Sequence, residues 1–240
     1  MIRAVFASLL VLAATAALAD DAAVRRVLQG KLGGAAIESV QKAPFGDLHE
    51  VVLRGPDGVR IIYVDSAASV ILAGEAIDAK TGQNLTQERQ RKLNTVKWSS
   101  LPFDSAVTTV RGTGRRKVAV FSDPNCPFCK RFEKDLARLD DITVYIFLFP
   151  VIRPESVAQT KSVWCSMDRA KAWNDLMLND VQPTAKPDCD TPVEKLLALG
   201  RKLGANSTPT WFVETGERYS GALALQDIRK ILDEASPPKR

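Results

Sequence analysis

Short apolar segments separated by turn-forming residues indicate that the first part of the chain is a small α+β unit. A helical stretch is predicted at residues 22–28. Apolar, β-branched segments at residues 50–54 and 59–64 flank Gly55-Pro56-Asp57-Gly58, whose residue types favour a turn, so the pattern predicts a hairpin. A third extended run is expected at residues 69–77.

A polar stretch at residues 84–97 follows this unit. Leu85 and Leu93 are its few apolar members, and charged or amide side chains occupy most other positions. Such a pattern favours a mostly solvated helix that joins two domains over a helix that belongs to a core.

After Pro102 the pattern predicts alternating strands and helices. The first are a short buried strand at residues 117–121 and a helix at residues 126–139. The helix has one apolar face, with members spaced by three, four and three residues: Cys129, Phe132, Leu136 and Leu139. The opposite face is expected to hold the charged side chains of Lys130, Arg131, Glu133, Lys134, Asp135 and Arg138.

Strands and helices continue to the C-terminal end. In chain order we expect a strand at residues 142–149, an interrupted helical segment at 155–178, a helix at 193–203, a hairpin at 210–213 and 218–220, and a final helix at 225–232. The second unit therefore belongs to the α/β class, with a helical insertion in its middle.

The first residues have the pattern of a cleavable secretory signal. Arg3 precedes an apolar run at residues 4–16, and small residues ending in Ala17-Leu18-Ala19 follow. A membrane anchor is the alternative, but the run is shorter than the ~20 residues that a spanning helix needs. We expect cleavage after Ala19 and an exported, soluble mature chain whose cysteines meet an oxidising compartment.

Composition narrows the class of protein further. The 240 residues include 45% hydrophobic and 25% charged side chains, as in an ordinary soluble domain, which argues against disorder and against a polytopic membrane protein. The formal net charge of +5 is spread along the chain and gives little support to nucleic-acid binding. The four cysteines are more informative, because two of them form a Cys-x-x-Cys motif.

Cys126 and Cys129 are the candidate catalytic residues. Cys126 opens the predicted helix, where unpaired backbone N–H groups and the helix dipole favour a thiolate. Pro127 suits the first turn, since its missing N–H has no intrahelical partner there. Cys129 lies on the apolar face and should be shielded, while Cys126 should point outward. We therefore expect Cys126 to be the attacking nucleophile and Cys129 the resolving thiol.

The Cys-x-x-Cys motif has three other interpretations. Zinc needs two more ligands, and the only histidine, His49, lies outside this unit. Covalent haem attachment needs a histidine where Lys130 stands. A structural short-loop disulfide stays open as an alternative. Redox chemistry is favoured, and it requires neither a metal nor an organic cofactor.

Cys165 and Cys189 favour a structural disulfide, with a second redox relay as the alternative. The bond would close a loop of about 25 residues and stabilise the fold by roughly 3 to 4 kcal/mol.

Asp123 precedes Cys126 by three residues. It is expected to cap a turn, and it could also orient the loop or shift the acidity of the thiol.

Several segments together resemble the bacterial periplasmic disulfide isomerases of the DsbC/DsbG type, over nearly the whole mature chain. The resemblance is carried by Phe121-Ser122-Asp123-Pro124-Asn125-Cys126-Pro127-Phe128-Cys129-Lys130, by Ser207-Thr208-Pro209-Thr210, and by Tyr219-Ser220-Gly221-Ala222-Leu223. Ile61-Ile62-Tyr63-Val64 and Val70-Ile71-Leu72-Ala73-Gly74 are similar to that family's N-terminal domain.

The resemblance implies a cis peptide bond at Thr208-Pro209, packed against the dithiol, with the Thr208 backbone pairing with substrate. It implies that Cys165 and Cys189 are the additional structural pair of DsbC-like members. It also implies a homodimer joined through the N-terminal domains and reduction by a membrane reductase of the DsbD type. The Pro127-Phe128 pair departs from the Gly-Tyr that is often found at this site, and it leaves the redox poise open.

The predicted organisation is a signal peptide at residues 1–19, a cystatin-like dimerisation domain at 20–82, a linker helix at 83–104 and a thioredoxin-like catalytic domain at 105–240, with its helical insertion at about 154–192. The predicted function is isomerisation, with accompanying reduction, of non-native disulfides in misfolded exported proteins of the periplasm. A dithiol oxidase and a chaperone-like holdase are the alternatives.

Overall fold

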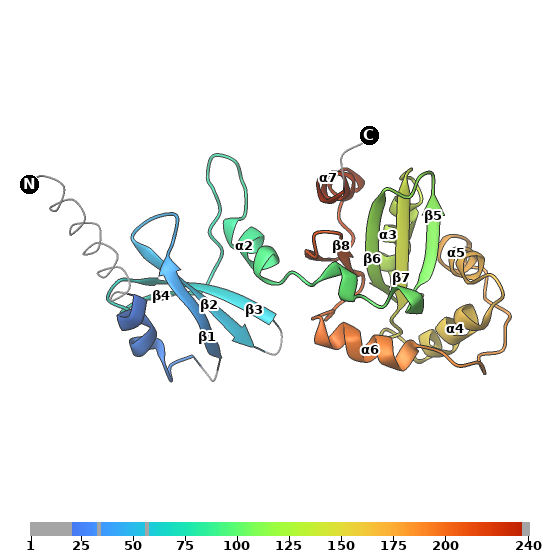
Figure 1. Ribbon diagram of the computed structural model, residues 1–240, viewed down its shortest axis with the longest axis horizontal. Coiled ribbons are helices and arrows are strands. Elements are labelled where there is room, and N and C mark those ends of the chain that lie inside the picture. Colours follow the sequence, from blue (N-terminus) through green and yellow to red (C-terminus); the bar gives the residue numbers. More distant parts are fainter. Residues whose placement is uncertain (1–20, 33–34, 56–57, 237–240) are drawn as a thin grey trace, which may run out of the picture. The chain divides into compact units, whose positions relative to one another are not determined.

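The computed structural model describes residues 21–32, 35–55 and 58–236, and the chain divides into two compact units between Asn94 and Thr95 (Figure 1). The predicted signal peptide at residues 1–19 lies outside the described residues. Among the residues that are described, none of the helices has the length and apolar character needed to cross a membrane.

The first unit contains an antiparallel sheet in the order β1-β2-β3-β4. Its strands are β1 (Ala36–Lys42), β2 (Leu48–Gly55), β3 (Gly58–Asp65) and β4 (Ile71–Leu72). The predicted hairpin is confirmed, since β2 and β3 pair from Leu48 and Asp65 to Gly55 and Gly58.

Both faces of β2 are buried, because successive side chains of a strand point to opposite faces. Val51 and Leu53 pack with Val24 and Leu28 of the helix at residues 21–28. Val52 packs on the other face with Ile61 and Tyr63 of β3. A helix therefore covers one face of the sheet, and a second element must cover the other.

That second element is α2 (Leu85–Leu93), which is shorter than the helix predicted at residues 84–97. The Asn84 side chain caps it by accepting a hydrogen bond from the Gln87 backbone N–H at 3.0 Å. The buried hydroxyls of Thr86 and Tyr63 lie 2.6 Å apart. The helix thus packs against β3 and belongs to the first unit.

The expected extended run at residues 69–77 is wrong for most of its length. Only Ile71–Leu72 form a strand, and they pair with Val64 and Tyr63 at the edge of the sheet. Val70 and Ile77 are 54% and 59% exposed, so apolar character in this segment does not reflect burial. Strand β1 was not predicted.

The second unit contains a five-stranded sheet in the order β5-β7-β6-β8-β9. Its strands are β5 (Val107–Arg111), β6 (Arg116–Ser122), β7 (Ile142–Leu148), β8 (Thr210–Val213) and β9 (Arg218–Ser220). The β6–β7 pair is parallel and the other pairs are antiparallel. Two short 3₁₀ helices, Trp98–Ser100 and Phe103–Ser105, precede β5.

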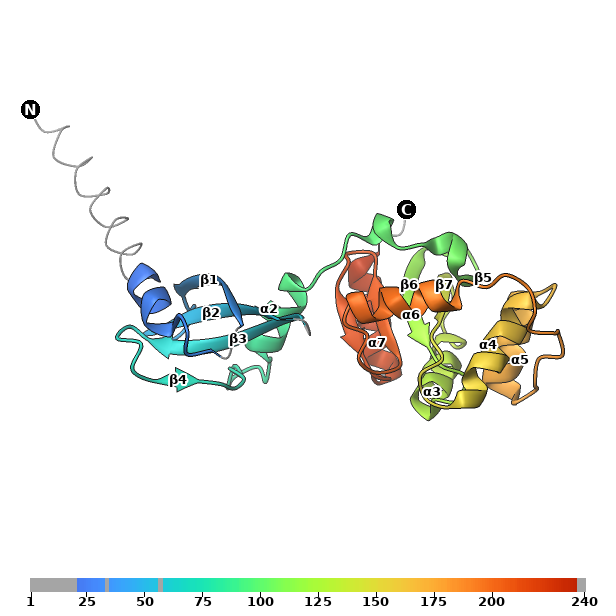
Figure 2. The same cartoon turned by 90° about the horizontal axis from the view of Figure 1, so that it is seen from below.

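Five helices accompany this sheet. They are α3 (Pro127–Leu136), α4 (Pro154–Cys165), α5 (Arg169–Asn179), α6 (Val193–Lys202) and α7 (Leu225–Ala235). Helix α3 connects the parallel strands β6 and β7, whereas α4 and α5 form the insertion and lie side by side (Figure 2). Helix α5 also contacts α3 and β5.

Strand β6 fixes the position of the loop that carries the dithiol. It lies between β7 and β8, and every residue of β6 from Val118 to Ser122 is buried. The apolar face of α3, with Phe132 and Leu136, packs into the same core as Trp211 of β8. The chain therefore leaves a rigid central strand and enters α3 within four residues, 123 to 126.

Candidate active site

Cys126 is the N-cap residue of α3, as the sequence predicted for a cysteine that opens this helix. Its backbone is extended, its carbonyl accepts from the Lys130 N–H at 3.1 Å, and Pro127 occupies the first turn. Cys129 follows one turn later on the buried face of the helix. Both thiols are free in this structure.

The expectation that Cys126 points outward is wrong, because the residue is only 3% exposed. The segment before β8 covers it: the Cys126 Sγ lies 3.3 Å from the Thr208 carbonyl oxygen, to which the thiol donates when it is protonated. The Thr208-Pro209 peptide bond is cis. This segment and the dithiol lie together although 82 residues separate Cys126 from Thr208.

The surroundings lower the pKa of the Cys126 thiol to about 5. The largest cause is the hydrogen bond from the Cys129 side chain, which stabilises the thiolate. Burial opposes this effect, and hydrogen bonds from the Cys129 and Phe128 backbone N–H groups add to it. At neutral pH the residue is therefore a thiolate and hence a nucleophile.

Cys129 has the opposite acidity. Burial raises the pKa of its thiol well above the usual range, and the nearby Cys126 raises it further, while the Ser122 side chain partly offsets the increase. The residue is fully buried. Cys129 consequently stays protonated and supplies the hydrogen bond that stabilises its partner.

A buried carboxylate holds the loop in front of α3. Asp123 accepts hydrogen bonds from the backbone N–H groups of Asn125, Val151 and Ile152 and from the Ser156 hydroxyl, at 2.7 to 2.8 Å. It is fully buried, and it joins the dithiol loop to the segment after β7 and to α4. The sequence indicated a turn cap, and the structure adds the two long-range contacts.

Glu133 does not lie on the charged outer face of α3, so the prediction made for it is wrong. The residue is 7% exposed, and the Trp173 Nε1–H of α5 donates to its carboxylate at 3.2 Å. Burial raises the pKa of Glu133 to about 7, against the opposing effects of Trp173 and Arg111. Its spacing of four residues from Cys129 was the signal that could have placed it on the buried side.

Cys165 and Cys189 form a disulfide with a Cα–Cα distance of 5.8 Å. It joins the last residue of α4 to the loop before α6. The same loop is also held by the Trp164 Nε1–H, which donates to the Asp190 carbonyl oxygen at 3.1 Å, and by the Ser162 hydroxyl, which donates to the Ala185 carbonyl oxygen at 2.6 Å. In the described part of the chain, no group of three or more histidine, cysteine or acidic residues could hold a metal ion.

Exposed apolar side chains flank the dithiol loop. Phe128, between the two cysteines, is 59% exposed. Val151 and Ile152, whose backbone N–H groups are bound by Asp123, are 48% and 47% exposed. An apolar rim next to a reactive thiolate is suited to contact with a polypeptide rather than with a small polar molecule.

The parallel β6–α3–β7 unit, the dithiol at the N-terminus of α3 and the facing cis proline define a thiol–disulfide oxidoreductase of the thioredoxin fold. The family described as a thioredoxin-like domain matches residues 103–236, and the disulfide bond isomerase protein N-terminal domain matches residues 15–87.

Curated relatives identify the family more narrowly. The chain is 40% identical over 212 residues to the probable thiol:disulfide interchange protein DsbC of Bordetella parapertussis, covering 88% of this chain and 74% of the relative. It is 26% identical over 225 residues to the thiol:disulfide interchange protein DsbC of Escherichia coli, covering 91% and 89%. The chain belongs to the DsbC family of thiol:disulfide interchange proteins and is a disulfide isomerase.

Solved structures agree with this assignment. A disulfide interchange protein from Neisseria gonorrhoeae is 38% identical, with a TM-score of 0.55, and the match covers 57% of this chain and all of that one. The thiol-disulfide exchange protein α-DsbA2 from Wolbachia pipientis is 18% identical with a TM-score of 0.51, and it shares the fold.

Proposed function

We propose that Cys126 is the nucleophile that rearranges non-native disulfides in misfolded exported proteins. Its thiolate attacks one sulfur of a client disulfide, so that a Cys126–client disulfide forms and the client's other sulfur leaves as a thiolate, which takes up a proton. A second client thiolate then attacks the client sulfur of the mixed disulfide and releases Cys126 as a thiolate. The client ends with a new pairing and no net oxidation.

Cys129 is proposed to resolve the mixed disulfide when no client thiol does so. Its thiol loses a proton and attacks Cys126, the client leaves reduced, and the two electrons come from the protein's dithiol, which becomes a disulfide. An external dithiol must then restore the reduced pair, and a membrane reductase of the DsbD type is the proposed donor.

The position of Cys126 at the N-cap of α3, against the cis Thr208-Pro209 segment, is the observation that carries this proposal, and the low pKa of its thiol agrees with it. A thiol with a pKa of about 5 is ionised at neutral pH, and it is also a good leaving group when the mixed disulfide is resolved. The backbone of Thr208 is proposed to pair with an extended client segment, supported by its 3.3 Å contact with Cys126. Phe128, Val151 and Ile152 are proposed to contact the client's apolar residues.

The proposed setting is the periplasm, reached through a signal peptide cleaved after Ala19. The N-terminal disulfide isomerase domain supports a homodimer joined through the first unit, to which α2 belongs. Residues 105–240 are the proposed catalytic domain, and the segment from Thr95 to Asp104 is the proposed connection to it. In such an assembly each protomer contributes one dithiol.

Recovery of activity by a scrambled disulfide protein tests the proposal. Cys126→Ser is expected to abolish the recovery, because the attacking sulfur is gone. Cys129→Ser is expected to retain part of it and to accumulate mixed disulfides, since client thiols can still resolve them. Full isomerase activity in Cys126→Ser would refute the assignment of the nucleophile.

Two rival functions give different results in simple assays. A dithiol oxidase would keep Cys126 and Cys129 mainly oxidised in the cell, and alkylation of the thiols in vivo measures this state. A holdase without thiol chemistry would suppress aggregation of a cysteine-free client equally well after both cysteines are changed to serine. The match to the isomerase N-terminal domain favours the isomerase.

A further inference from the structure

A groove of about 610 Å³ lies along the outer face of α3, on the opposite side of the helix from Cys129. Pro127, the residue that follows the nucleophile, is part of its lining, and the first residue of α7, Leu225, forms part of another wall. The groove therefore adjoins the first turn of α3, directly after Cys126 in the chain, although neither cysteine lines it.

Its lining is strongly basic. Four basic side chains, those of Lys130, Arg131, Lys134 and Arg138, face one acidic side chain, that of Asp135. Across the whole chain, 33 basic residues are balanced by 28 acidic ones, so this concentration is a local feature and not a consequence of composition.

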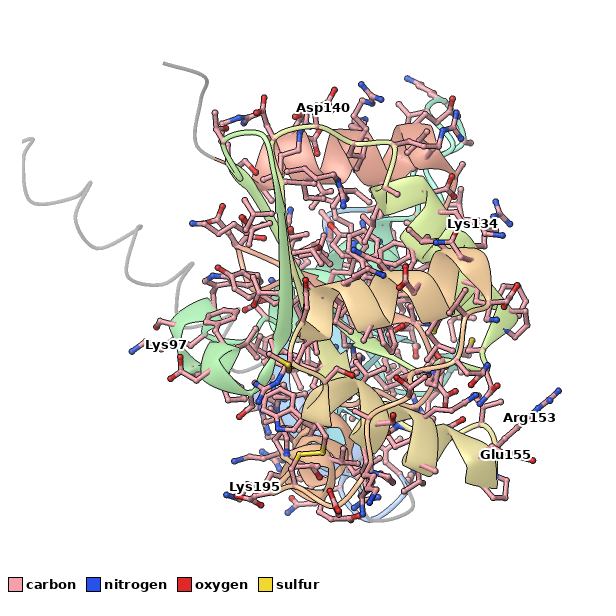
Figure 3. All side chains as sticks on the ribbon, turned by 90° about the vertical axis from the view of Figure 1, so that its right-hand side faces the viewer. Lys97, Lys134, Asp140, Arg153, Glu155 and Lys195 are labelled. Carbon is pink, nitrogen blue, oxygen red and sulfur yellow. A yellow bond between two sulfur atoms is a disulfide. The ribbon has the colours of Figure 1, made fainter. Side chains whose placement is uncertain are left out.

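The acidic groups nearby do not neutralise the groove. Asp135 is shared by Arg131 at 4.0 Å and Arg138 at 3.5 Å. Asp180 pairs with Lys130 from outside the groove. Lys134 is exposed, and Figure 3 shows it at the outer margin of the second unit. The lining thus presents excess positive charge in a depression that includes Pro127, the residue after Cys126.

We propose that this groove binds an acidic segment of the client polypeptide that flanks the disulfide under attack. The proposal rests on the proposed function, because the client's disulfide must reach Cys126. At about 1.5 Å per residue, the helical surface from Pro127 to Arg138 spans about 16 Å. An extended chain rises about 3.3 Å per residue, so about five client residues fill the groove.

The recognition is electrostatic, and its expected dependence on salt follows from that. Opposite charges at a partly exposed surface attract weakly one at a time, but several together raise the local concentration of an acidic segment and the rate of encounter. Salt screens such interactions over about 10 Å at 0.1 M ionic strength. Preference for acidic clients should therefore be largest at low ionic strength.

The test uses the full-length mature protein with its dithiol reduced beforehand and two disulfide peptides of equal length. One peptide has five aspartates and glutamates beside the reactive cysteine, and the other has asparagines and glutamines in their place. The wild type is expected to react with the acidic peptide about five- to tenfold faster, as a second-order rate constant at low salt. Raising the ionic strength should shrink that ratio.

Charge reversal within the groove should remove the preference. In Lys134→Glu/Arg138→Glu the ratio of the two rate constants is expected to fall to about one or below. The control Lys195→Glu/Arg201→Glu changes the net charge equally on α6, and it should keep the wild-type ratio. Figure 3 shows Lys195 far from Lys134, so the two variants alter different surfaces.

The possible results distinguish a failure of the proposed client binding in the groove from a failure of the proposed thiol chemistry. Equal rates for the two peptides in the wild type would refute only the proposal that the groove binds an acidic segment. A preference for the acidic peptide that survives in Lys134→Glu/Arg138→Glu would refute the same proposal. An equal slowing of both peptides in that variant would also overturn it, because the loss would then lie at the dithiol. Failure of the wild type to react with either peptide would overturn the proposed function and with it the groove.

Discussion

Cys126 and Cys129 have the same side chain and lie one helical turn apart, yet their surroundings give them opposite acidities. Cys126 receives hydrogen bonds from a thiol and two backbone N–H groups, and its pKa falls to about 5. Cys129 is fully buried, and its pKa rises. The difference assigns the thiolate to the first cysteine before any substrate is considered.

Replacing Cys129 with alanine should raise the pKa of Cys126, because the largest stabilising hydrogen bond on the thiolate is lost. Alkylation of Cys126 by iodoacetamide across a pH series measures this. In the wild type the rate should rise with pH to a midpoint near 5 and then level off. In Cys129→Ala the midpoint should move toward neutral pH, and an unchanged midpoint would rule out the Cys129 hydrogen bond as the cause.

Glu133 should make the second unit less stable as the pH rises. Its pKa is about 7 in the fold and near 4.5 in the unfolded chain, so between these values the folded state binds more protons and the free energy of unfolding falls with increasing pH. Glu133→Gln keeps the acceptor for the Trp173 N–H and removes the charge. At pH 8 it should gain about 2 to 3 kcal/mol relative to the wild type, and at pH 4 almost nothing.

Urea unfolding followed by tryptophan fluorescence measures this, because all four tryptophans lie in the second unit. Glu234→Gln is the matched control: its side chain is 67% exposed at the end of α7, and an exposed pair with Lys230 is worth only a few tenths of a kcal/mol, roughly, so the variant should stay close to the wild type. A Glu133→Gln stability difference that is the same at pH 4 and pH 8 would contradict the assignment.

The sequence predicted the positions of residues best where the neighbours that determine them are close in the chain. The helix-opening position of Cys126 and the shielded position of Cys129 follow from local spacing. The burial of Cys126 beneath Thr208 and the contact between Glu133 and Trp173 depend on segments 82 and 40 residues away, so no local pattern contained them. The cis bond came from the family resemblance and not from the residues themselves.

At the scale of elements, the buried apolar strands and helices were predicted well, whereas the strands at the edges of the two sheets were not. Strands β6 and β7, with their continuous buried runs, and helix α3, with its apolar face, lie within a few residues of their predicted bounds. Strand β5 was missed, since Val107 is its one buried residue and the other four are exposed or half-buried. Strand β1 was missed for a similar reason, since its residues are only partly buried at the edge of the first sheet.

The insertion should depend on its disulfide for stability. Cys165→Ala/Cys189→Ala removes a cross-link between residues 24 positions apart, and the greater chain entropy of the unfolded state should lower the free energy of unfolding by about 2 to 4 kcal/mol. Urea unfolding followed by tryptophan fluorescence measures the change. Because α5 also contacts α3 and β5, the loss should appear in the unfolding transition of the whole second unit and not only in the insertion.

Chemical reduction of the Cys165–Cys189 bond provides the control for that experiment. Cys126→Ala/Cys129→Ala leaves the Cys165–Cys189 bond intact, so in the wild type and in this variant a strong reductant should lower stability by a similar amount. A stability equal to that of the wild type in Cys165→Ala/Cys189→Ala would mean that the hydrogen bonds of Trp164 and Ser162 alone hold the insertion.

At the scale of the whole molecule, the four cysteines separate into two pairs with different chemistry. One pair is free and lies at the start of a helix, and the other is bonded and lies in the insertion. The N-terminal unit carries no cysteine, so its contribution to isomerisation is proposed to be assembly rather than chemistry. Family membership rests on both units, since each matches a domain found in disulfide isomerases or thioredoxin-like proteins.

The most direct measurement of the central claim locates the client on the enzyme. Cys129→Ser protein is mixed with a scrambled disulfide client, quenched with acid and alkylating reagent, and mapped by mass spectrometry of its peptides. We predict a covalent adduct on Cys126 and none on Cys165 or Cys189, which should remain joined to each other. A client attached through either of those cysteines, or adducts that persist in Cys126→Ser/Cys129→Ser, would contradict the account.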